Sequence, residues 1–555
     1  MFYQIYPRSF MDGNGDGIGD LAGIIEKLDY LNDGTPRSLG IDAIWFSPFF
    51  TSPDRDFGYD VADYCAIDPR YGTIADFNRL VQEAHRRGIR ILLDLVVNHT
   101  SSEHPWFKES RASRESAKRD WYIWRDGRGP GNKPPNNWRN NFFGPAWTWD
   151  ELTGQYYLHS FLKEQPDLNW QNPAVQEAVF DAVRFWLERG ADGFRLDVAH
   201  AYCKDEQFRD NPPFYRRRRP ADSQPARDRS LLINLFHIFG LPELQLKKYN
   251  EHHPATHRVL KEFRQVLDSY PEKTSVGEIF SEDPHVQAAY YGSGNDELHL
   301  NFHFDLMHCR WNAGAFRRCV ERWERLLPAA AWPAYTFNNH DNMRSISRYG
   351  QGGQGDQQAR LLALLLLTLR GAPFIYYGEE IGMKDPLLPK RLLQDPVGLK
   401  WYPLHRGRDG ARTPMQWSGG AAAGFSRGEP WLPVGPEVET RNVAAQAKDP
   451  ASLLSFYRRL IRLRKEMPSL RLGGYRTLAQ GAPDDCYCYL RELDGRKAAV
   501  ALNFSRKPQV VDLSSEGNSW RLILSTDPRR NPETGISSLT LKPNEGCLLL
   551  LEVGD

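Results

Sequence analysis

The 555-residue chain lacks an excess of charge of either sign, and this absence limits the classes of partner that it can bind. Lys and Arg total 71 against 70 Asp and Glu. A near-neutral balance provides no long-range field for collecting phosphate backbones or anionic lipid. We therefore expect no nucleic acid and no membrane partner. The one strong basic run, 216–219, is interpreted as a solvated loop tip.

Long apolar runs are also missing, and the first residues have none of the features of a secretory leader. A membrane span needs roughly 18 unbroken apolar residues, and the longest candidate, LLALLLLTL at 361–369, is flanked by Arg360 and Arg370. We expect a buried helix there. The first ten residues, MFYQIYPRSF, show no basic start and no small-residue cleavage site. The expected location is therefore cytoplasmic.

Cysteine is scarce in this chain. The seven cysteines are odd in number and widely spread. This argues against a complete disulfide framework in a chain of this length. We expect seven reduced thiols.

Short apolar runs alternate with amphipathic stretches, a pattern typical of parallel strands covered by helices. Helical periodicity occurs at 21–31, 75–88, 172–190 and 256–270. The eight strand-like runs lie at 2–7, 43–50, 89–97, 192–199, 274–280, 298–304, 334–340 and 373–379. Eight such units predict an α/β fold of the closed (β/α)8 TIM-barrel type. A doubly wound open sheet is the alternative, but no GxGxxG turn follows the first strand.

Two segments break the alternation. Residues 98–162 are rich in Trp, Asn, Gly and Pro and predict an inserted subdomain after the third strand. From 471 to 555, strands joined by turn residues predict a C-terminal antiparallel β-sandwich. The barrel then comprises 1–97 and 163–470.

Three acids stand where apolar strands end: Asp197, Glu278 and Asp341. In such barrels the working side chains project from the carboxyl ends of the strands. One acid of this kind is most often part of a structural ion pair, but three at one rim favour catalysis. Cleaving an acetal needs one carboxylate at the anomeric carbon and one protonated carboxyl group at the leaving oxygen. Arg195 shares the strand face of Asp197 and would keep it ionised, whereas Glu278 would need a raised pKa.

Five segments resemble, in order, the characteristic regions of the alpha-amylase superfamily, glycoside hydrolase family 13. They are DLVVNHT (94–100), QPDLN (165–169), GFRLDVAH (193–200), VGEIF (276–280) and FNNHDN (337–342). QPDLN has the form found in oligo-1,6-glucosidases and related alpha-glucosidases. The resemblance implies that Asp197 is the nucleophile, Glu278 the acid/base, and Asp341 the acid that grips substrate hydroxyls.

The resemblance also implies a closed substrate pocket. FGYDVADY (57–64) is similar to the loop in which a Tyr stacks on the terminal glucose and an Asp binds its far hydroxyls. HRGRDGARTPMQW (405–417) is similar to the loop whose Arg pairs with that Asp, which we assign to Arg408 with Arg412 as the alternative. A closed pocket implies removal of one glucose at a time from the non-reducing end. The expected substrate-binding residues are Tyr59, Asp60, His99, Gln165, Arg195, Val198, His340 and Arg408.

A metal site is expected near the N-terminus, where DGNGDGIGD alternates oxygen-bearing residues. The EF-hand glutamate is absent, because Gly23 occupies the twelfth position. Similar alpha-glucosidases carry a structural calcium in this loop, with magnesium as the alternative cation, and an Asx-rich turn without metal is the other interpretation. No organic cofactor is expected. The expected ligands are Asp12, Asn14, Asp16, the carbonyl of Ile18, and Asp20.

The sequence thus predicts a retaining, exo-acting alpha-glucosidase that cleaves short alpha-1,4- or alpha-1,6-linked oligosaccharides, with transglucosylation as a side activity. Val198, after the nucleophile, resembles enzymes that accept alpha-1,6 bonds, whereas Ala or Thr there goes with alpha-1,4. One such side chain alters discrimination by ~1 to 3 kcal/mol. A sucrose- or trehalose-type isomerase or a transglucosidase of the same family is the first alternative, although NMRSISRYG after Asp341 does not resemble the RLDRD segment of sucrose isomerases. A non-catalytic amylase-like partner of a membrane transporter is the remote one.

Overall fold

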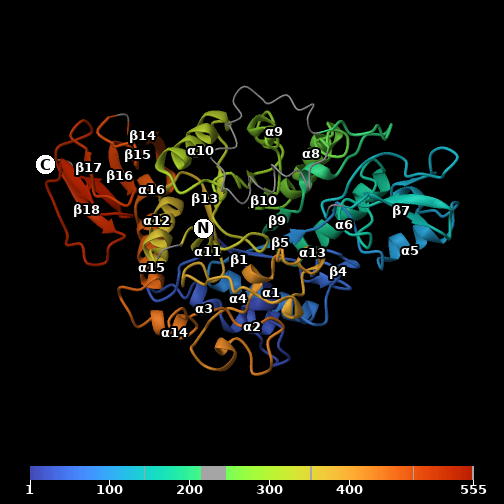
Figure 1. Ribbon diagram of the computed structural model, residues 1–555, viewed down its shortest axis with the longest axis horizontal. Coiled ribbons are helices and arrows are strands. Elements are labelled where there is room, and N and C mark those ends of the chain that lie inside the picture. Colours follow the sequence, from blue (N-terminus) through green and yellow to red (C-terminus); the bar gives the residue numbers. More distant parts are fainter. Residues whose placement is uncertain (143, 214–244, 351–352, 479, 553–555) are drawn as a thin grey trace.

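The computed structural model describes residues 1–142, 144–213, 245–350, 353–478 and 480–552. The Arg run at 216–219 lies outside the described residues. Within the described chain, the molecule is elongated, with a central barrel flanked by a β domain at one end and an inserted segment at the other (Figure 1).

Eight parallel strands form the centre of the molecule. Their order is β11-β10-β9-β5-β2-β1-β13-β12, and a parallel bridge between Phe302 and Ala334 joins the two outer strands. This bridge closes the sheet, so the predicted (β/α)8 barrel is confirmed and the open-sheet alternative is excluded. The strands are β1 (Phe2–Ile5), β2 (Ala43–Phe46), β5 (Arg90–Leu95), β9 (Gly193–Leu196), β10 (Thr274–Gly277), β11 (Leu300–Asn301), β12 (Ala334–Thr336) and β13 (Ala372–Tyr376).

Each strand is shorter than the apolar run that predicted it. The run 192–199, for example, leaves the ladder after Leu196, and Val198 adopts a left-handed conformation with φ 35°. The residues after the strand ends are released from the ladder, and this is where the predicted acids lie.

Helices cover the outside of the barrel and begin where capping residues predict. Thr73 and Asp76 form a capping box at the start of α4, and Asn172 with Pro173 begins α6. The apolar stripes of these helices pack on the strands. The main barrel helices are α2 (Leu21–Glu26), α3 (Leu28–Leu31), α4 (Ile74–Arg86), α6 (Pro173–Glu188), α8 (Ala255–Asp268), α10 (Ala313–Leu326), α12 (Gly355–Thr368) and α15 (Leu453–Glu466).

The helix predicted at 361–369 is confirmed as part of α12. Its residues from Gln358 to Thr368 are all buried, because α15 and strands of the C-terminal domain pack against it. In the described chain, every helix is too short or too polar to span a bilayer. All seven cysteines are free thiols, as predicted.

The C-terminal strands form two antiparallel sheets around a separate apolar core. The larger sheet has the order β14-β15-β16-β20-β18, and β17 pairs with β19. Side chains of both sheets, such as Leu490 and Leu539, share one buried cluster, which confirms a sandwich. The strands are β14 (Gly474–Thr477), β15 (Cys486–Leu493), β16 (Arg496–Asn503), β17 (Gln509–Asp512), β18 (Trp520–Ser525), β19 (Ser538–Leu541) and β20 (Gly546–Leu551).

The segment after β5 carries its own small sheet. It contains helix α5 (Pro105–Ala112) and three antiparallel strands, β6 (Trp124–Arg125), β8 (Gln155–Leu158) and β7 (Trp147–Asp150). Trp138 and Trp147 lie in its buried core. The numerical domain limits 98–162 and 471–555 stay a prediction.

Candidate active site

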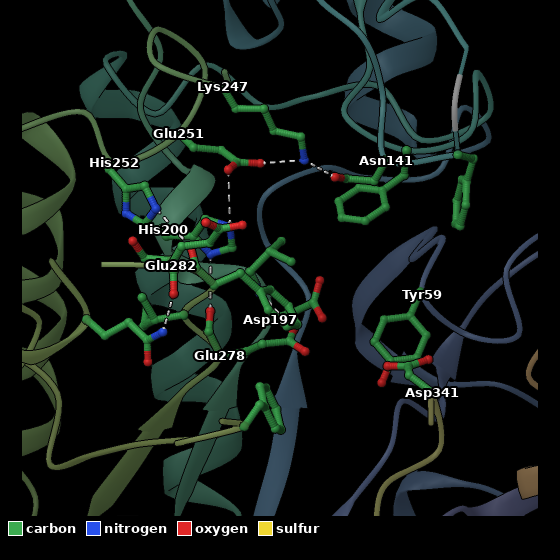
Figure 2. Close-up of a pocket in the computed structure, with 18 of the residues that line it drawn as sticks. Tyr59, Asn141, Asp197, His200, Lys247, Glu251, His252, Glu278, Glu282 and Asp341 are labelled. Atoms are coloured by element: carbon green, nitrogen blue, oxygen red, sulfur yellow. Dashed lines mark hydrogen bonds and ion pairs between the residues drawn. The ribbon is translucent and has the colours of Figure 1, made fainter. Parts of the chain in front are cut away.

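A cavity of about 740 Å³ opens at the carboxyl ends of the barrel strands. Residues after β9, β10 and β12 line it together with Asn141, Phe142 and Phe161 of the inserted segment, Gln165, and residues 245–248 and 251–252. Figure 2 shows Asp197 and Glu278 on one side of this pocket and Tyr59 and Asp341 on the other. The three acids predicted from the sequence therefore meet in one place.

Arg195, on β9, lies at the centre of the acidic groups and is 1% exposed. Its Nη1 donates to Asp94 Oδ1 and to Asp197 Oδ1, both at 2.6 Å. Its Nη2 lies 2.5 Å from Glu278 Oε2. Asp94 comes from β5, where it is the register partner of Arg195. One guanidinium thus holds three carboxyl groups from three adjacent strands.

The three carboxyl groups differ in proton affinity. Burial raises the pKa of Glu278 to about 8; Arg195 opposes this shift, and the charges of Asp197 and Asp341 add to it. Burial raises the pKa of Asp197 to about 6, against the attraction of Arg195. Burial raises the pKa of Asp94 to about 7. Near neutral pH, Asp197 is mostly ionised while Glu278 keeps its proton.

Tyr59 and Asp341 line the opposite wall, whereas the predicted substrate-binding residue His340 does not line the cavity and packs behind them. Burial opposes ionisation of Asp341, but its contact with the His340 ring and the positive charges of Arg408 and Arg412 hold its pKa well below the usual range. His340 Nε2 lies 2.5 Å from the Tyr59 hydroxyl and 3.2 Å from Asp341, and its ring stacks parallel to that of Tyr59. Burial lowers the pKa of His340 to about 3, so the ring is neutral.

Arg408 closes the far end of the pocket, but with a different acid from the one expected. Its Nη2 binds Asp56 Oδ1 at 2.7 Å, and its Nη1 reaches Asp341 at 3.3 Å. Asp60 faces away from the cavity and accepts hydrogen bonds from the Ser52 hydroxyl and from two backbone N–H groups. The assignment of Asp60 to the pocket was therefore wrong, and Asp56 takes that position.

The alternative arginine also contacts this wall. Arg412 is 1% exposed, donates to Asp341 at 3.0 Å and to the His340 carbonyl at 2.8 Å. It does not line the cavity, whereas Arg408 does. The choice of Arg408 thus agrees with its position.

His99, Gln165 and Val198 also line the cavity. The Gln165 amide nitrogen lies 3.1 Å from His99 Nε2 and 3.3 Å from Asp56, so the two residues buttress the closed end. Val198 is a β-branched residue with φ 35°, and its N–H points to Glu278 Oε2 at 3.3 Å. Such a backbone stores strain of order 1–3 kcal/mol. This conformation places the Val198 side chain directly beside the acid pair.

Sequence reasoning missed the open side of the pocket. Phe280 and Phe304 stack there, and Lys247, Glu251 and His252 line it as well. Figure 2 shows the last three on the side away from Tyr59 and Asp341. They come from segments without strong periodicity, so only a family comparison could have pointed to them. Asp94 was detectable, because an acid inside an otherwise apolar strand needs a buried partner.

The predicted metal ligands lie outside the pocket lining, and their oxygens are engaged by the loop itself. Asp12 accepts N–H bonds from two glycines, and Asp20 accepts three backbone N–H bonds, one of them as the cap of α2. Asn14 and Asp16 bond each other, and the Ile18 N–H donates to Asp16. No group of three or more His, Cys, Asp or Glu side chains in the described residues could hold a metal. The carboxylates of this loop thus accept hydrogen bonds from backbone N–H groups of the same loop. The bound cation stays a prediction.

A closed parallel barrel that gathers acids of unequal pKa around one arginine, in a pocket at its strand ends, defines a glycoside hydrolase. Comparison with known proteins identifies the family. Residues 4–473 match the model of the alpha amylase catalytic domain. The chain belongs to the alpha-amylase family.

Two relatives with assigned names cover most of the chain. The "Probable alpha-glucosidase" of Rhizobium meliloti (strain 1021) is 46% identical over 476 residues, covering 85% of this chain and 83% of that protein. The oligo-1,6-glucosidase of Parageobacillus thermoglucosidasius is 39% identical over 542 residues, covering 92% and 91%. These comparisons confirm the resemblance drawn from the five motifs.

Solved structures share the whole fold. The alpha-glucosyl transfer enzyme XgtA superposes with a TM-score of 0.89 at 40% identity, covering 100% of this chain and 98% of that one. The trehalulose synthase MutB from Pseudomonas mesoacidophila MX-45 superposes with a TM-score of 0.85 at 35% identity, with coverage of 100% and 98%. Glucosidases, an alpha-glucosyl transfer enzyme and a trehalulose synthase are thus all named among the similar proteins.

Proposed function

We propose that this protein is a retaining alpha-glucosidase that removes a terminal glucose from the non-reducing end of short alpha-linked oligosaccharides. The observation that carries the proposal is the shared guanidinium of Arg195, which binds Asp197 and Glu278 while the pKa of Glu278 lies above that of Asp197. Retaining enzymes hold their two carboxyl groups ~5–5.5 Å apart, against ~6.5–9.5 Å in inverting enzymes. Contact with one guanidinium favours the shorter separation.

In the first step, the Asp197 carboxylate attacks the anomeric carbon as the glycosidic bond breaks. Glu278 gives its proton to the departing oxygen, so that the leaving sugar departs as a neutral alcohol and glucose is held as an ester on Asp197. In the second step, water attacks the same carbon, Glu278 takes a proton from that water, and the Asp197 carboxylate is released. Two inversions at one carbon retain the alpha configuration.

The closed end of the pocket supports exo action. Asp56, Arg408 and Asp341 form a connected charged wall beyond the catalytic pair. Charged groups at this wall can bind the hydroxyls of one terminal glucose, and they leave no exit for a longer chain on that side. Tyr59 completes the wall, and the His340 ring stacks against it.

The first step also allows transfer, because a sugar can replace water as the acceptor of the glucosyl ester. In isomerisation, the acceptor is the leaving sugar itself, which attacks the glucosyl ester through a different hydroxyl group. Similarity to XgtA and MutB supports transfer or isomerisation as the second candidate function. A small oligosaccharide is the proposed partner in either case, and cytoplasmic location stays a prediction.

Time-resolved proton NMR of the purified enzyme with equal amounts of maltose and isomaltose tests the proposal. Early release of alpha-glucose is expected from both, with faster loss of isomaltose if Val198 favours alpha-1,6 bonds. Initial release of beta-glucose would overturn retention. A parallel reaction with sucrose separates the candidates, since an isomerase accumulates a new disaccharide where a glucosidase releases glucose.

A further inference from the structure

The short segment that follows β10 carries the acid/base and has no regular secondary structure. Residues 278–283 connect β10 to α9 (Pro284–Ala289). The carbonyl of Glu278 accepts an N–H bond from Ala199 at 3.1 Å, and the carbonyl of Ser281 accepts from the Gln287 amide at 2.5 Å. The position of the segment therefore depends on groups outside it.

Between these two anchors, His252 binds the carbonyl of Phe280. Its Nε2 lies 2.9 Å from that oxygen, and its Nδ1 lies 3.0 Å from the Tyr290 hydroxyl. A carbonyl only accepts, so Nε2 carries the hydrogen and the neutral ring accepts from Tyr290 through Nδ1. Both ring nitrogens are thus committed, and burial lowers the pKa of His252, which keeps the ring neutral.

The backbone around His252 is also fixed. His252 has φ 55°, a left-handed conformation that is uncommon for residues other than glycine, although asparagine, aspartate and histidine adopt it more often than the rest. Its N–H donates to the carbonyl of His200 at 2.8 Å, and the two histidine rings stack 5.1 Å apart. His200 lies three residues after Asp197, so His252 connects the strand end of the nucleophile to that of the acid/base.

Phe280 has few other contacts that could hold its backbone. The residue is 48% exposed and lines the pocket, and its ring stacks on Phe304 at 5.4 Å and lies edge-on to His200 at 5.8 Å. Because about half of Phe280 is exposed, its packing contributes only part of what holds the segment in place.

We propose that His252 is a positioning residue for the acid/base step: by holding the Phe280 carbonyl, it places Glu278 against the glycosidic oxygen and Phe280 against the leaving sugar. The inference rests on the proposed function, because it takes Glu278 as the acid/base. His252 acts on the leaving-group side and lies on the side of the pocket away from Tyr59 and Asp341 (Figure 2). Its loss should impair departure of a sugar while sparing recognition of the terminal glucose.

Two variants separate the Phe280 contact from the other contacts of the ring. In His252→Asn, the amide oxygen replaces Nδ1 as acceptor and asparagine tolerates the left-handed backbone, but the side chain is too short to reach the Phe280 carbonyl. In His252→Gln, an amide N–H at the reach of Nε2 can restore that bond. Comparing the two variants therefore tests whether the hydrogen bond to the Phe280 carbonyl is the contact on which activity depends.

The measurement is kcat and KM of both variants on isomaltose and on an aryl alpha-glucoside with a nitrophenol leaving group, together with inhibition by free glucose. For His252→Asn we expect kcat on isomaltose to fall on the order of 10- to 100-fold, as displacement of catalytic groups by about 1 Å does. For the aryl glucoside, whose departure needs little acid, kcat/KM reports only the first step and should stay at the wild-type value, and glucose inhibition should not change. His252→Gln should recover most of the isomaltose rate.

Full isomaltose activity in His252→Asn would overturn the proposal. An equal loss of activity on both substrates, together with weaker glucose inhibition, would also overturn it, because that pattern indicates a merely structural role. If His252→Asn does not fold, Tyr290→Phe removes the partner of Nδ1 alone. It should produce the same substrate pattern with a smaller loss, and an equal loss on both substrates would again contradict positioning. Failure of the proposed function is distinguishable, because wild-type enzyme would then release no alpha-glucose from isomaltose.

Discussion

The rate of glucoside cleavage should follow a bell-shaped pH profile, because the two central carboxyl groups must be in opposite protonation states. Asp197, with a pKa of about 6, must be ionised to attack, so kcat/KM should fall as the pH drops through that value. Glu278, with a pKa of about 8, must be protonated, so kcat/KM should fall as the pH rises through that value. The optimum is expected near pH 7.

The width of the profile follows from the separation of these values. At about pH 7 each group is one unit from its own pKa and about 90% in the required form, so roughly 80% of the enzyme is competent. At about pH 5 or pH 9, only roughly 10% is competent. The apparent values belong to the coupled carboxyl groups around Arg195 and not to one residue alone.

The assay compares kcat/KM from about pH 4.5 to pH 10 for wild type and Glu278→Gln. On isomaltose, the variant should lose nearly all activity. On an aryl glucoside with a good leaving group, the variant should retain activity for the first step. Its kcat/KM should still fall below about pH 6, but it should no longer fall at alkaline pH. An alkaline limb at the same pH in Glu278→Gln would refute the reasoning, because another group would then control it.

Three further changes test separate parts of the site. Asp56→Asn removes one of the charged partners of Arg408 and should lower kcat/KM on the order of 10- to 100-fold, as loss of a charge-assisted bond of ~1.5–3 kcal/mol does. Asp60→Asn is the matched control, and an equal fall there would contradict the assignment. Val198→Thr should shift the maltose-to-isomaltose ratio of kcat/KM toward maltose by up to ~3 kcal/mol, and an unchanged ratio in the NMR assay would discard the role of this side chain. If the loop 12–20 binds calcium, EDTA should lower Tm and calcium should restore it, with Asp16→Ala abolishing the response; equal Tm values throughout would favour a metal-free Asx turn.

The barrel and its acids could be predicted because both follow from local patterns. Fully buried parallel strands are apolar along their whole length. A charged residue at the end of such a strand therefore lies at the rim of the barrel. Asp197, Glu278 and Asp341 obey this rule. The family motifs then supplied the roles that spacing alone could not.

The error at Asp60 arose from a turn that the sequence pattern does not show. Phe57 and Gly58 have φ 50° and 96°, so the chain reverses between Asp56 and Tyr59. This reversal puts Asp56 and Tyr59 in the pocket and turns Asp60 back onto backbone N–H groups. Two aspartates four residues apart cannot be told apart without that geometry.

The residues on the open side escaped prediction for a different reason. His252 and Phe280 meet only because β9 and β10 are neighbours in the barrel and the segments beyond them curl toward each other. Contacts between irregular segments have no period to detect. Their partners become visible only in three dimensions.

The contact of Arg195 with both carboxyl groups makes the proton affinity of Glu278 depend on the covalent state of Asp197. While Asp197 is a free carboxylate, its charge helps to keep Glu278 protonated. In the proposed mechanism, Asp197 carries no charge once it is bound as an ester, so Glu278 has lost both its proton and the neighbour that favoured one. It then remains ionised and can accept a proton from water. Release of glucose restores the charge on Asp197 and draws a proton back to Glu278. Each half of the proposed turnover thereby sets the acidity that the next half requires.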